Sequence, residues 1–411
     1  MLKGAFFFLA GIILSSSALA SNCIDCHKTV TPGIVKEWEL SKHSQNNIDC
    51  VVCHQTTHNS ATDVSKASIP TPDVCGHCHS EQVEQFKKGK HSKAWESMIA
   101  MPTAHQQPMA MMEGMKGCGG CHKIGLKSEE EIAKIQKTGG YGLASCDACH
   151  TRHQFSLKEA RSPQACQTCH MGIDHAQWEM YSSSKHGVRY LLKQNGTLPE
   201  NTAAPTCQFC HLNGGNHANR TAWGFLAVRL PMPGDKQWAA DRTSVLKALG
   251  VLDPQGKPTD RLKVVTGLDV VRLTEDDFAQ ERKKMVQICM NCHSESFTKD
   301  HFAKSDGMIK EADKLMAEAI ETVAALYRDM VAQKPDWYAY GYADVLTFHD
   351  APTVIEDKLF KMFFEYRMRT FQGAFHANPD YSLWYGWSAM RTSLTEIKAL
   401  AGQMRREAKG R

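Results

Sequence analysis

Every one of the sixteen cysteines in this 411-residue chain belongs to a Cys-x-x-Cys-His motif, and eight such motifs use them all. Two thiols three positions apart can add to the two vinyl groups on one porphyrin edge, and the following histidine then reaches the iron as its proximal ligand. Zinc sites and disulfide frameworks also use paired cysteines, but neither requires a histidine directly after all eight pairs. We therefore predict eight covalently attached haem c groups, one on each motif: Cys23-Cys26-His27, Cys50-Cys53-His54, Cys75-Cys78-His79, Cys118-Cys121-His122, Cys146-Cys149-His150, Cys166-Cys169-His170, Cys207-Cys210-His211 and Cys289-Cys292-His293.

The density of these motifs, about one for every 50 residues, leaves little room for a conventional apolar core. Porphyrin faces would supply the apolar surface, and strand signals are sparse, so the sequence predicts an all-α, loop-rich fold wrapped around haems. After the eighth motif, apolar residues recur every three or four positions over 309–326, and the segments 354–375 and 383–404 also have helical patterns. Pro335 and Pro379 mark breaks. We expect these haem-free helices to form a C-terminal bundle that holds subunits together.

The N-terminus has the pattern of a secretory signal peptide, with Lys3 before a short apolar run and a small-residue cleavage site at Ala18-Leu19-Ala20. No later stretch approaches the roughly 18 consecutive apolar residues that a transmembrane helix needs. We therefore expect a soluble, periplasmic mature protein. The motif order divides the chain into a signal peptide (1–20), an N-terminal trihaem segment (21–110), a pentahaem core (111–300) and a C-terminal helical oligomerisation segment (301–411).

The formal charge of +4 falls to +3 once the predicted signal peptide takes Lys3 with it. Each ferric haem adds two propionates and about one positive charge at the iron, so eight haems would bring the holo-protein to roughly −5. This balance gives no support to a nucleic-acid partner. Many lysines and arginines should face propionates instead.

Of the 20 histidines, eight are proximal and 12 remain as candidates for the second axial position. An electron-transfer haem needs that second ligand, because six-coordinate low-spin iron reorganises little and binds no substrate. Three of the remaining histidines share one setting, in which an aromatic residue stands five positions before the histidine of Lys-His-(Ser/Gly). Others lie shortly after a proximal histidine. We predict seven distal ligands: His43, His58, His91, His105, His153, His186 and His217.

His105 lies in a methionine-rich loop, 98–115, just before the fourth motif. Methionine ligation from that loop is an alternative, although flexible packing against haem edges is the more common use of such residues. Four further histidines stay in reserve as ligands: His77, His301, His349 and His376.

A catalytic haem would need an open iron with polar groups above it, and Asp174-His175, just after the sixth motif, is the best candidate for those groups. Adjacent aspartate and histidine can hold a small ligand and relay protons to it. Taken alone, such a pair is more often a structural hydrogen bond.

Two further stretches add to the pattern of the motif order: Cys146-Asp-Ala-Cys149-His150-Thr-Arg-His153, and Asp174-His175 leading to Ser184-Lys185-His186-Gly187. Together they resemble the hydroxylamine oxidoreductase (HAO) family of octahaem c-type cytochromes, and the last five motifs also resemble the pentahaem cytochrome c nitrite reductases. The resemblance covers nearly the whole mature chain. It implies that the fourth haem, on Cys118, Cys121 and His122, is catalytic, and that Asp174 and His175 line its distal pocket. It also implies that His153, His186 and His217 are distal ligands, and that the protein is a homotrimer.

The chain departs from the pentahaem pattern at the fourth motif, where His122 stands in place of the usual lysine and favours the HAO side. In oxidative HAO members, a C-terminal tyrosine from a neighbouring subunit cross-links to the catalytic porphyrin, whereas members without the cross-link resemble reductases. Tyr381 and Tyr385 lie in the corresponding region, and we interpret them as aromatic packing residues of the helical bundle rather than as cross-linking residues.

We therefore expect an oxidoreductase that reduces nitrite or hydroxylamine to ammonium, with electrons from a donor cytochrome or a quinol-linked protein. Three alternatives stay open: hydroxylamine oxidation at a cross-linked haem, a pure electron-transfer conduit, and a tetrathionate-type octahaem reductase with a lysine ligand. No residue specifically favours the last of these.

Overall fold

The computed structural model describes residues 22–99, 119–137, 145–224, 226–268, 270, 274–336, 338, 342–346 and 351–410. The predicted signal peptide, His105, Cys118 and His349 lie outside these residues. The chain forms two compact units. Unit 1 comprises Met1–Trp95, Glu113–Ala165 and Asn216–Ala218, and unit 2 comprises Glu96–Met112, Cys166–Gly215 and Asn219–Arg411.

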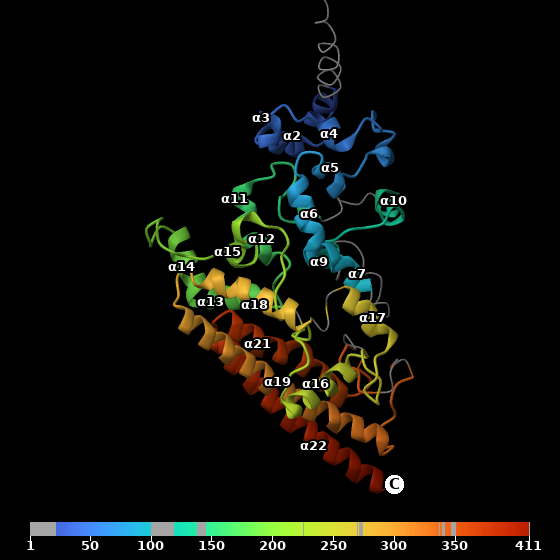
Figure 1. Cartoon of the computed structure of the whole chain (residues 1–411). Coiled ribbons are helices and arrows are strands. Elements are labelled where there is room, and N and C mark those ends of the chain that lie inside the picture. The colour runs from blue at the N-terminus through green and yellow to red at the C-terminus, as the bar shows by residue number, and fades with distance from the viewer. Residues whose placement is uncertain are drawn as a thin grey trace, which may run out of the picture. The chain divides into compact units, whose positions relative to one another are not determined.

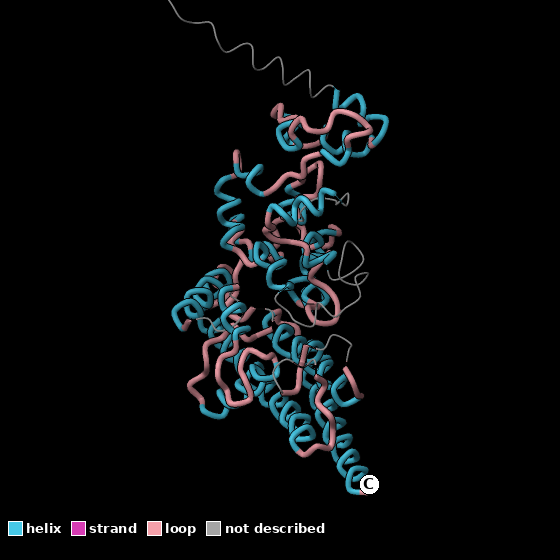
Figure 2. The backbone as a smooth tube through the Cα atoms, turned by 90° about the vertical axis from the view of Figure 1, so that its right-hand side faces the viewer, coloured by secondary structure: helices cyan, strands magenta, loops and turns pink. Residues whose placement is uncertain are grey.

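The described chain is helix and loop throughout, as Figure 2 shows, and none of these residues forms a β-strand. One isolated antiparallel bridge joins Leu252 to Pro258 across a turn. The predicted all-α fold is confirmed. The chain passes between the two units several times, including once between Ala165 and Cys166, inside the predicted pentahaem core. The predicted division by motif order stays a prediction.

Unit 1 carries the first five motifs on short helices with few buried side chains. A helical turn suits the motif, because positions i, i+3 and i+4 share one helix face, and α4 (Cys50–His54) begins at one of its cysteines. Asp49 caps α4 by accepting the backbone N–H of Val51 at 3.1 Å. The other elements within this unit are α2 (Pro32–Glu39), α3 (Lys42–Gln45), η1 (Val64–Lys66), α5 (Pro72–Gly76), α6 (Ser80–Lys88), η2 (His91–Lys93), α9 (Gly119–His122), α10 (Glu129–Lys137), η5 (Cys146–Ala148) and α11 (Leu157–Ala160) (Figure 1).

Unit 2 carries the last three motifs on a similar set of short helices. Ser184 ends one helix and begins the next, because its side chain accepts the backbone N–H of Gly187 at 3.3 Å. These elements are α13 (Gln177–Ser183), α14 (Lys185–Gln194), α15 (Cys207–His211), η6 (Asn213–Gly215) and α18 (Glu275–Cys289), while α7 (Ala94–Ile99) and α12 (Gln164–Gln167) span the unit boundaries.

The large apolar core of unit 2 lies among its long C-terminal helices, where α19 packs against α16, α21 and α22 (Figure 1). The predicted helical segments are all helical, and the segment 380–388 adds a π-helical stretch. The elements are α16 (Lys236–Ala248), α17 (Asp260–Gly267), α19 (Glu295–Arg328), α20 (Val354–Lys361), η7 (Met362–Arg367), α21 (Met368–Phe375), η8 (Asp380–Ser388) and α22 (Ala389–Lys409). None of the helices that the structure describes has the length and apolar content of a membrane span.

A buried ionic cluster ties these helices together. Asp313 of α19 accepts a hydrogen bond from Arg242 of α16 at 2.7 Å, from Arg367 of η7 at 2.8 Å and from the Trp238 indole at 2.9 Å. All three charged side chains are almost fully buried. Burial raises the pKa of Asp313, but the two guanidinium groups outweigh burial and hold that pKa below its usual value. The carboxylate is therefore charged, and its loss would leave two buried cations.

Candidate haem centres

Five histidine pairs bring a motif histidine opposite a histidine from elsewhere in the chain. Their ring centroids are 6.1 Å apart for His27 and His58, 6.2 Å for His79 and His43, 6.2 Å for His54 and His153, 6.3 Å for His150 and His217, and 6.1 Å for His293 and His186. The first four pairs lie in unit 1 and the fifth lies in unit 2. All five non-motif histidines are among the predicted distal ligands.

The spacing of these pairs fits an iron between two imidazoles. A metal–imidazole nitrogen bond of about 2.0–2.1 Å, added to about 1.1 Å from that nitrogen to the ring centre, places two trans imidazole centroids about 6.3 Å apart. The nearby motif cysteines agree with haem attachment, because both cysteines of the first, second, third, sixth, seventh and eighth motifs are free thiols rather than disulfides. The residues present therefore fit covalently bound haem c.

The electrostatics of the pairs also suit iron ligation, which needs a neutral imidazole with a lone pair. Burial lowers the pKa of His27, and the facing His58 lowers it further. Burial and a facing histidine lower the pKa of His43, of His150, of His153 and of His186 in the same way. These histidines are therefore neutral at physiological pH.

Hydrogen bonds at Nδ1 orient three of the paired rings. His27 Nδ1 contacts the Thr31 hydroxyl at 2.6 Å, and His58 Nδ1 contacts Asp63 Oδ1 at 2.8 Å. His54 Nδ1 donates to the backbone carbonyl of Ser68 at 2.9 Å. Partners of this kind fix the tautomer of a ligating histidine and leave Nε2 for the metal. Sequence reasoning missed all three partners, because serine, threonine and aspartate at such spacings carry no signal.

The remaining motif, predicted and reserve histidines are not among the five facing pairs. His91 begins η2, and burial lowers its pKa. His122 and His211 end α9 and α15. Of the reserves, His301 lies parallel to Phe297, with ring centroids 6.4 Å apart, and His376 donates its Nδ1–H to the Gln372 carbonyl at 2.8 Å. His77, His105 and His349 complete the set; His77 is exposed, and the other two lie outside the described residues.

Phe297 is a further haem-site residue that sequence reasoning missed. Its ring stacks on the motif histidine His293, with ring centroids 4.8 Å apart, although its side chain is 55% exposed. A phenylalanine four residues after a proximal histidine has no distinctive pattern. Its position suits packing against a porphyrin face.

Asp174 and His175 lie in the loop between the sixth motif and α13. The loop is held by two backbone hydrogen bonds, from Trp178 N–H to the His170 carbonyl at 2.9 Å and from Gln177 N–H to the His175 carbonyl at 2.7 Å. Gly172 has a φ of +103°, which favours glycine at this bend. His175 Nδ1 is hydrogen-bonded to Asp174 Oδ1, so the predicted pair is formed.

His175 differs from the paired histidines in its protonation. Burial lowers its pKa, but the hydrogen bond and charge of Asp174, a hydrogen bond to the Cys169 carbonyl and the charge of Glu179 outweigh burial and raise the pKa above its ordinary value. An imidazolium has two N–H groups and no lone pair, and these two acceptors match it. His175 is thus set up to hold a proton.

The ring of His175 also lies 6.3 Å from that of His170, a spacing that would accommodate an iron. The Asp174 bond at Nδ1 does not argue against this use, because His58 has the same kind of partner in Asp63. The hydrogen bond to the Cys169 carbonyl and the raised pKa are what set His175 apart from the five paired histidines. We therefore interpret His175 as a proton-holding residue beside the sixth motif. His175 belongs to unit 2 and His122 to unit 1, so the predicted place of the pair above the fourth haem stays a prediction.

Tyr381 and Tyr385 lie together on the π-helical segment η8, with ring centroids 5.2 Å apart. Burial raises the pKa of Tyr381, and the charge of Glu179 on α13 raises it further. Asn378, just before η8, donates to the Met180 carbonyl at 2.9 Å. The C-terminal tyrosines are therefore near the helix that follows the Asp174–His175 pair, within the same unit.

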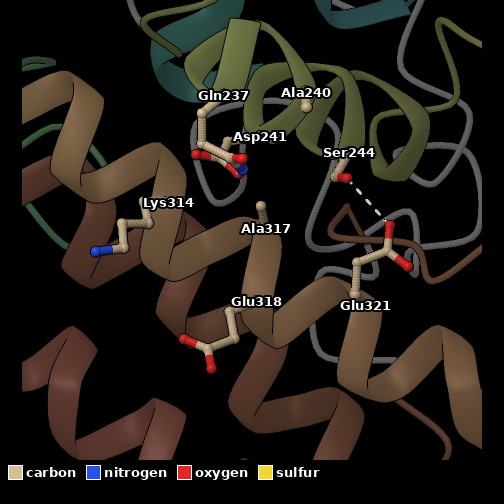
Figure 3. Close-up of a pocket in the computed structure, with 8 residues that line it drawn as sticks. All are labelled: Gln237, Ala240, Asp241, Ser244, Lys314, Ala317, Glu318 and Glu321. Carbon is tan, nitrogen blue, oxygen red and sulfur yellow. Dashed lines mark hydrogen bonds between the residues drawn. The ribbon is translucent and has the colours of Figure 1, made fainter.

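A groove of about 480 Å³ lies elsewhere in unit 2, between α16 and α19 (Figure 3). Ser244 donates to Glu321 Oε1 at 3.0 Å across one end of it. Its lining contains no motif residue: Gln237, Ala240, Asp241, Ser244, Lys314, Ala317, Glu318 and Glu321. The groove is therefore separate from the haem centres.

A family model described as "Seven times multi-haem cytochrome CxxCH" matches residues 19–243 and 269–335. The chain belongs to this multi-haem cytochrome family. Its members bind several haem c groups through such motifs, so multiple haem c sites are expected on this chain as well. The identification agrees with the predicted family resemblance.

Individual relatives of this multi-haem cytochrome are distant. A Kuenenia stuttgartiensis protein named "Probable nitrite reductase-hydroxylamine oxidoreductase fusion protein" is 26% identical over 93% of this chain. The chain spans about half (51%) of that relative's length. The chain is thus a distant homologue of an HAO-type protein.

Two solved structures share the fold. A chain of a Kuenenia stuttgartiensis reducing HAO-like protein complex superposes with a TM-score of 0.70 at 23% identity, over 98% of this chain and 88% of the other. A hypothetical multiheme protein superposes with a TM-score of 0.66 at 20% identity, over 98% of this chain and all (100%) of the other. The arrangement of helices is therefore that of HAO-like multi-haem proteins.

Proposed function

We propose that this multi-haem cytochrome is an octahaem oxidoreductase of the HAO type that reduces nitrite or hydroxylamine to ammonium. The observation that carries the proposal is the contrast among the histidines. Five predicted distal ligands face motif histidines at iron-spanning distance, and the pKa is lowered in three of them, His43, His153 and His186. Asp174, by contrast, is hydrogen-bonded to His175 and raises its pKa. A chain that only carried electrons would have no use for a partly buried proton donor beside its haems.

The haems, when bound, supply electrons and an open iron for a small nitrogen ligand, which we place at the fourth motif, on Cys118, Cys121 and His122. The chain's own residues supply the rest. A protonated His175 attracts an anion such as nitrite and donates hydrogen bonds and protons to its oxygens. Asp174 holds the ring in one orientation and stabilises its positive charge. Reduction of nitrite consumes several protons, so a donor with a raised pKa suits that direction.

The names of the relatives support the same reaction class. One carries nitrite reductase and hydroxylamine oxidoreductase in its name, and the solved complex is titled as a reducing HAO-like protein. These words describe those proteins. We extend this reaction class to the present chain because it shares the fold and carries the Asp174–His175 pair.

Export and assembly belong to the same proposal. We propose that the predicted signal peptide directs the chain to the periplasm and that the long helices α19 and α22 take part in a homotrimer. A complex formed by a solved relative supports a protein partner, for which an electron-donor cytochrome or quinol-linked protein is the natural choice. Light scattering of the holo-protein tests the trimer, and a monomer at micromolar concentration would contradict it.

Assays in both directions test the reaction itself. The purified holo-protein should reduce nitrite and hydroxylamine with a dye donor and release ammonium, and it should oxidise hydroxylamine more slowly. Peptide mass spectrometry checks for a porphyrin linked to Tyr381 or Tyr385. Faster oxidation together with such a link would favour the oxidative alternative. No turnover in either direction would refute the proposal and leave the electron-conduit and tetrathionate-reductase alternatives.

A further inference from the structure

The distal histidine His217 lies in a loop rather than on a helix. Two glycines with left-handed backbone angles, Gly214 (φ +67°) and Gly215 (φ +81°), come shortly before it, and its own stretch has no regular secondary structure. His186, by contrast, lies in the first turn of α14. A loop that contains glycines has many backbone conformations open to it. The place of His217 opposite His150 therefore depends on contacts made by the loop itself.

One side chain fastens this loop to α6. Gln85 Oε1 accepts the backbone N–H of His217 at 2.9 Å, across 132 positions of sequence. Residues 216–218 cluster with unit 1, to which Gln85 and His150 belong, whereas the chain directly before and after them belongs to unit 2. The hydrogen bond therefore helps to hold the distal histidine in the unit that carries the fifth motif.

The amide of Gln85 is oriented for this contact. Its Nε2 donates to Glu81 Oε1 at 2.9 Å, one helical turn earlier on α6. An ionised carboxylate only accepts hydrogen bonds, so it takes the NH₂ end of the amide and leaves Oε1 for the His217 N–H. Both Gln85 and His217 are half-buried, and a backbone N–H in such a place needs an acceptor.

The backbone contact acts on a residue whose ring is in place for an iron. The His217 ring faces that of His150 with centroids 6.3 Å apart and an interplanar angle of 29°. Because the backbone N–H and the ring belong to one residue, fixing the first limits how far the second can move. The second motif has a similar contact: Glu37 Oε2 accepts the backbone N–H of His153, the residue that faces His54, at 3.0 Å. Two distal histidines from distant parts of the chain are thus held by their own backbone.

We propose that Gln85 is a positioning residue for haem ligation: its hydrogen bond to the His217 backbone keeps that histidine on the iron of the fifth haem. Gln85 touches neither iron nor substrate in this account. The inference goes beyond the proposed function, because it concerns the ligation of an electron-transfer haem and holds whether or not the chain turns over nitrite.

Three substitutions separate this hydrogen bond from general effects on α6. Gln85→Ala removes the acceptor, whereas Gln85→Glu keeps an acceptor oxygen on a side chain of the same length. Gln82→Ala, at an exposed position of the same helix, makes the same change of residue type and is the matched control. Haem content is measured for each holo-protein to confirm that every variant folds and is loaded.

The readout is the rate at which cyanide binds to the ferric holo-protein, followed in the visible spectrum beside the low-spin EPR signals. Cyanide reaches the iron of a bis-histidine haem only after one imidazole has come off, so a slow phase reports how often His217 leaves. The His217→Ala protein identifies this phase, because its fifth iron is open. Gln85→Ala should speed the phase by about tenfold, the lower end of the range for a lost outer-shell partner. Gln85→Glu and Gln82→Ala should stay near the parent rate.

The double variant Gln85→Ala/His217→Ala completes a double-mutant cycle. With His217 absent, Gln85→Ala should have no further effect on cyanide binding, and an effect that persists would overturn the inference, because Gln85 would then act on another group. A parent-like rate in Gln85→Ala, or equal acceleration by Gln85→Ala and Gln82→Ala, would overturn it as well. So would parent-like cyanide kinetics in His217→Ala, since His217 would then not be a ligand. Each of these results leaves the proposed nitrite chemistry untouched.

Discussion

Removing the imidazole of His175 is the most informative single change in this protein. His175→Ala takes away a partly buried histidine whose pKa is raised by the hydrogen-bonded Asp174, and it leaves the haem motifs and the five facing pairs untouched. Loss of a general acid lowers turnover by about 10²–10⁴, which corresponds to about 2.7–5.4 kcal/mol of transition-state stabilisation. We expect kcat/KM for nitrite and hydroxylamine to fall within this range.

Asp174→Asn changes the protonation of His175 without removing its imidazole. The ring stays, but its pKa falls because the carboxylate that raises it is gone. A proton donor with a raised pKa is active at low pH and loses activity as the pH rises through that pKa, so the variant should lose activity at a lower pH than the parent. At pH values above the pKa of His175 in both proteins, the loss should be about tenfold, equivalent to a downward shift of about one pH unit.

Steady-state reduction assays with a dye donor, run from acid to alkaline pH, measure both variants. Haem content and the visible spectrum provide the control, because each variant must retain the parent complement of haems. If His175→Ala turns over as fast as the parent with all haems in place, His175 has no part in the mechanism. If Asp174→Asn and the parent lose activity over the same range of rising pH, the Asp174–His175 pair does not determine the pH dependence of turnover.

Three further changes test the ligand pairs and the core. His217→Ala should convert one low-spin haem to high spin in the EPR spectrum, because the His217 ring faces that of His150 with centroids 6.3 Å apart. The control His77→Ala should leave the spectrum unchanged. A parent-like spectrum for His217→Ala would show that His217 is not a ligand. Asp63→Asn should raise the reduction potential of one haem by some tens of millivolts in a spectroelectrochemical titration. The substitution weakens the hydrogen bond from His58, and that imidazole then becomes a weaker donor to ferric iron. Unaltered potentials would count against the pairing of His58 with Asp63. Asp313→Asn should lower the free energy of unfolding of the holo-protein in denaturant by about 3–5 kcal/mol, because two buried arginines lose their charged partner. The control Asp300→Asn, at an exposed ion pair, should lower it by no more than about 0.5 kcal/mol. Equal effects would contradict the role given to the buried cluster.

The haem attachment sites and the helical fold could be predicted because both depend on local patterns. A Cys-x-x-Cys-His motif is complete within five residues, and an amphipathic helix such as α19 repeats within one or two turns. The aromatic-to-Lys-His pattern is also local, and it marked His43 and His186, both of which face a motif histidine.

The partner of each distal histidine could not be predicted, because it depends on how distant segments pack. His58 follows the second motif but faces His27 of the first, while His54 of the second motif faces His153, which follows the fifth. No spacing along the chain encodes such crossings. The same reason hid Asp63, whose role arises only when a loop folds back on a histidine.

The central claim is that one iron on this chain has no protein ligand in its sixth position and that His175 serves it. EPR and visible spectra of the ferric holo-protein, recorded with and without nitrite, test this most directly. The account predicts a high-spin component from one haem that is lost or shifted when nitrite is added, and a weaker response in His175→Ala. A spectrum in which every haem is low-spin, and which nitrite leaves unchanged, would contradict it.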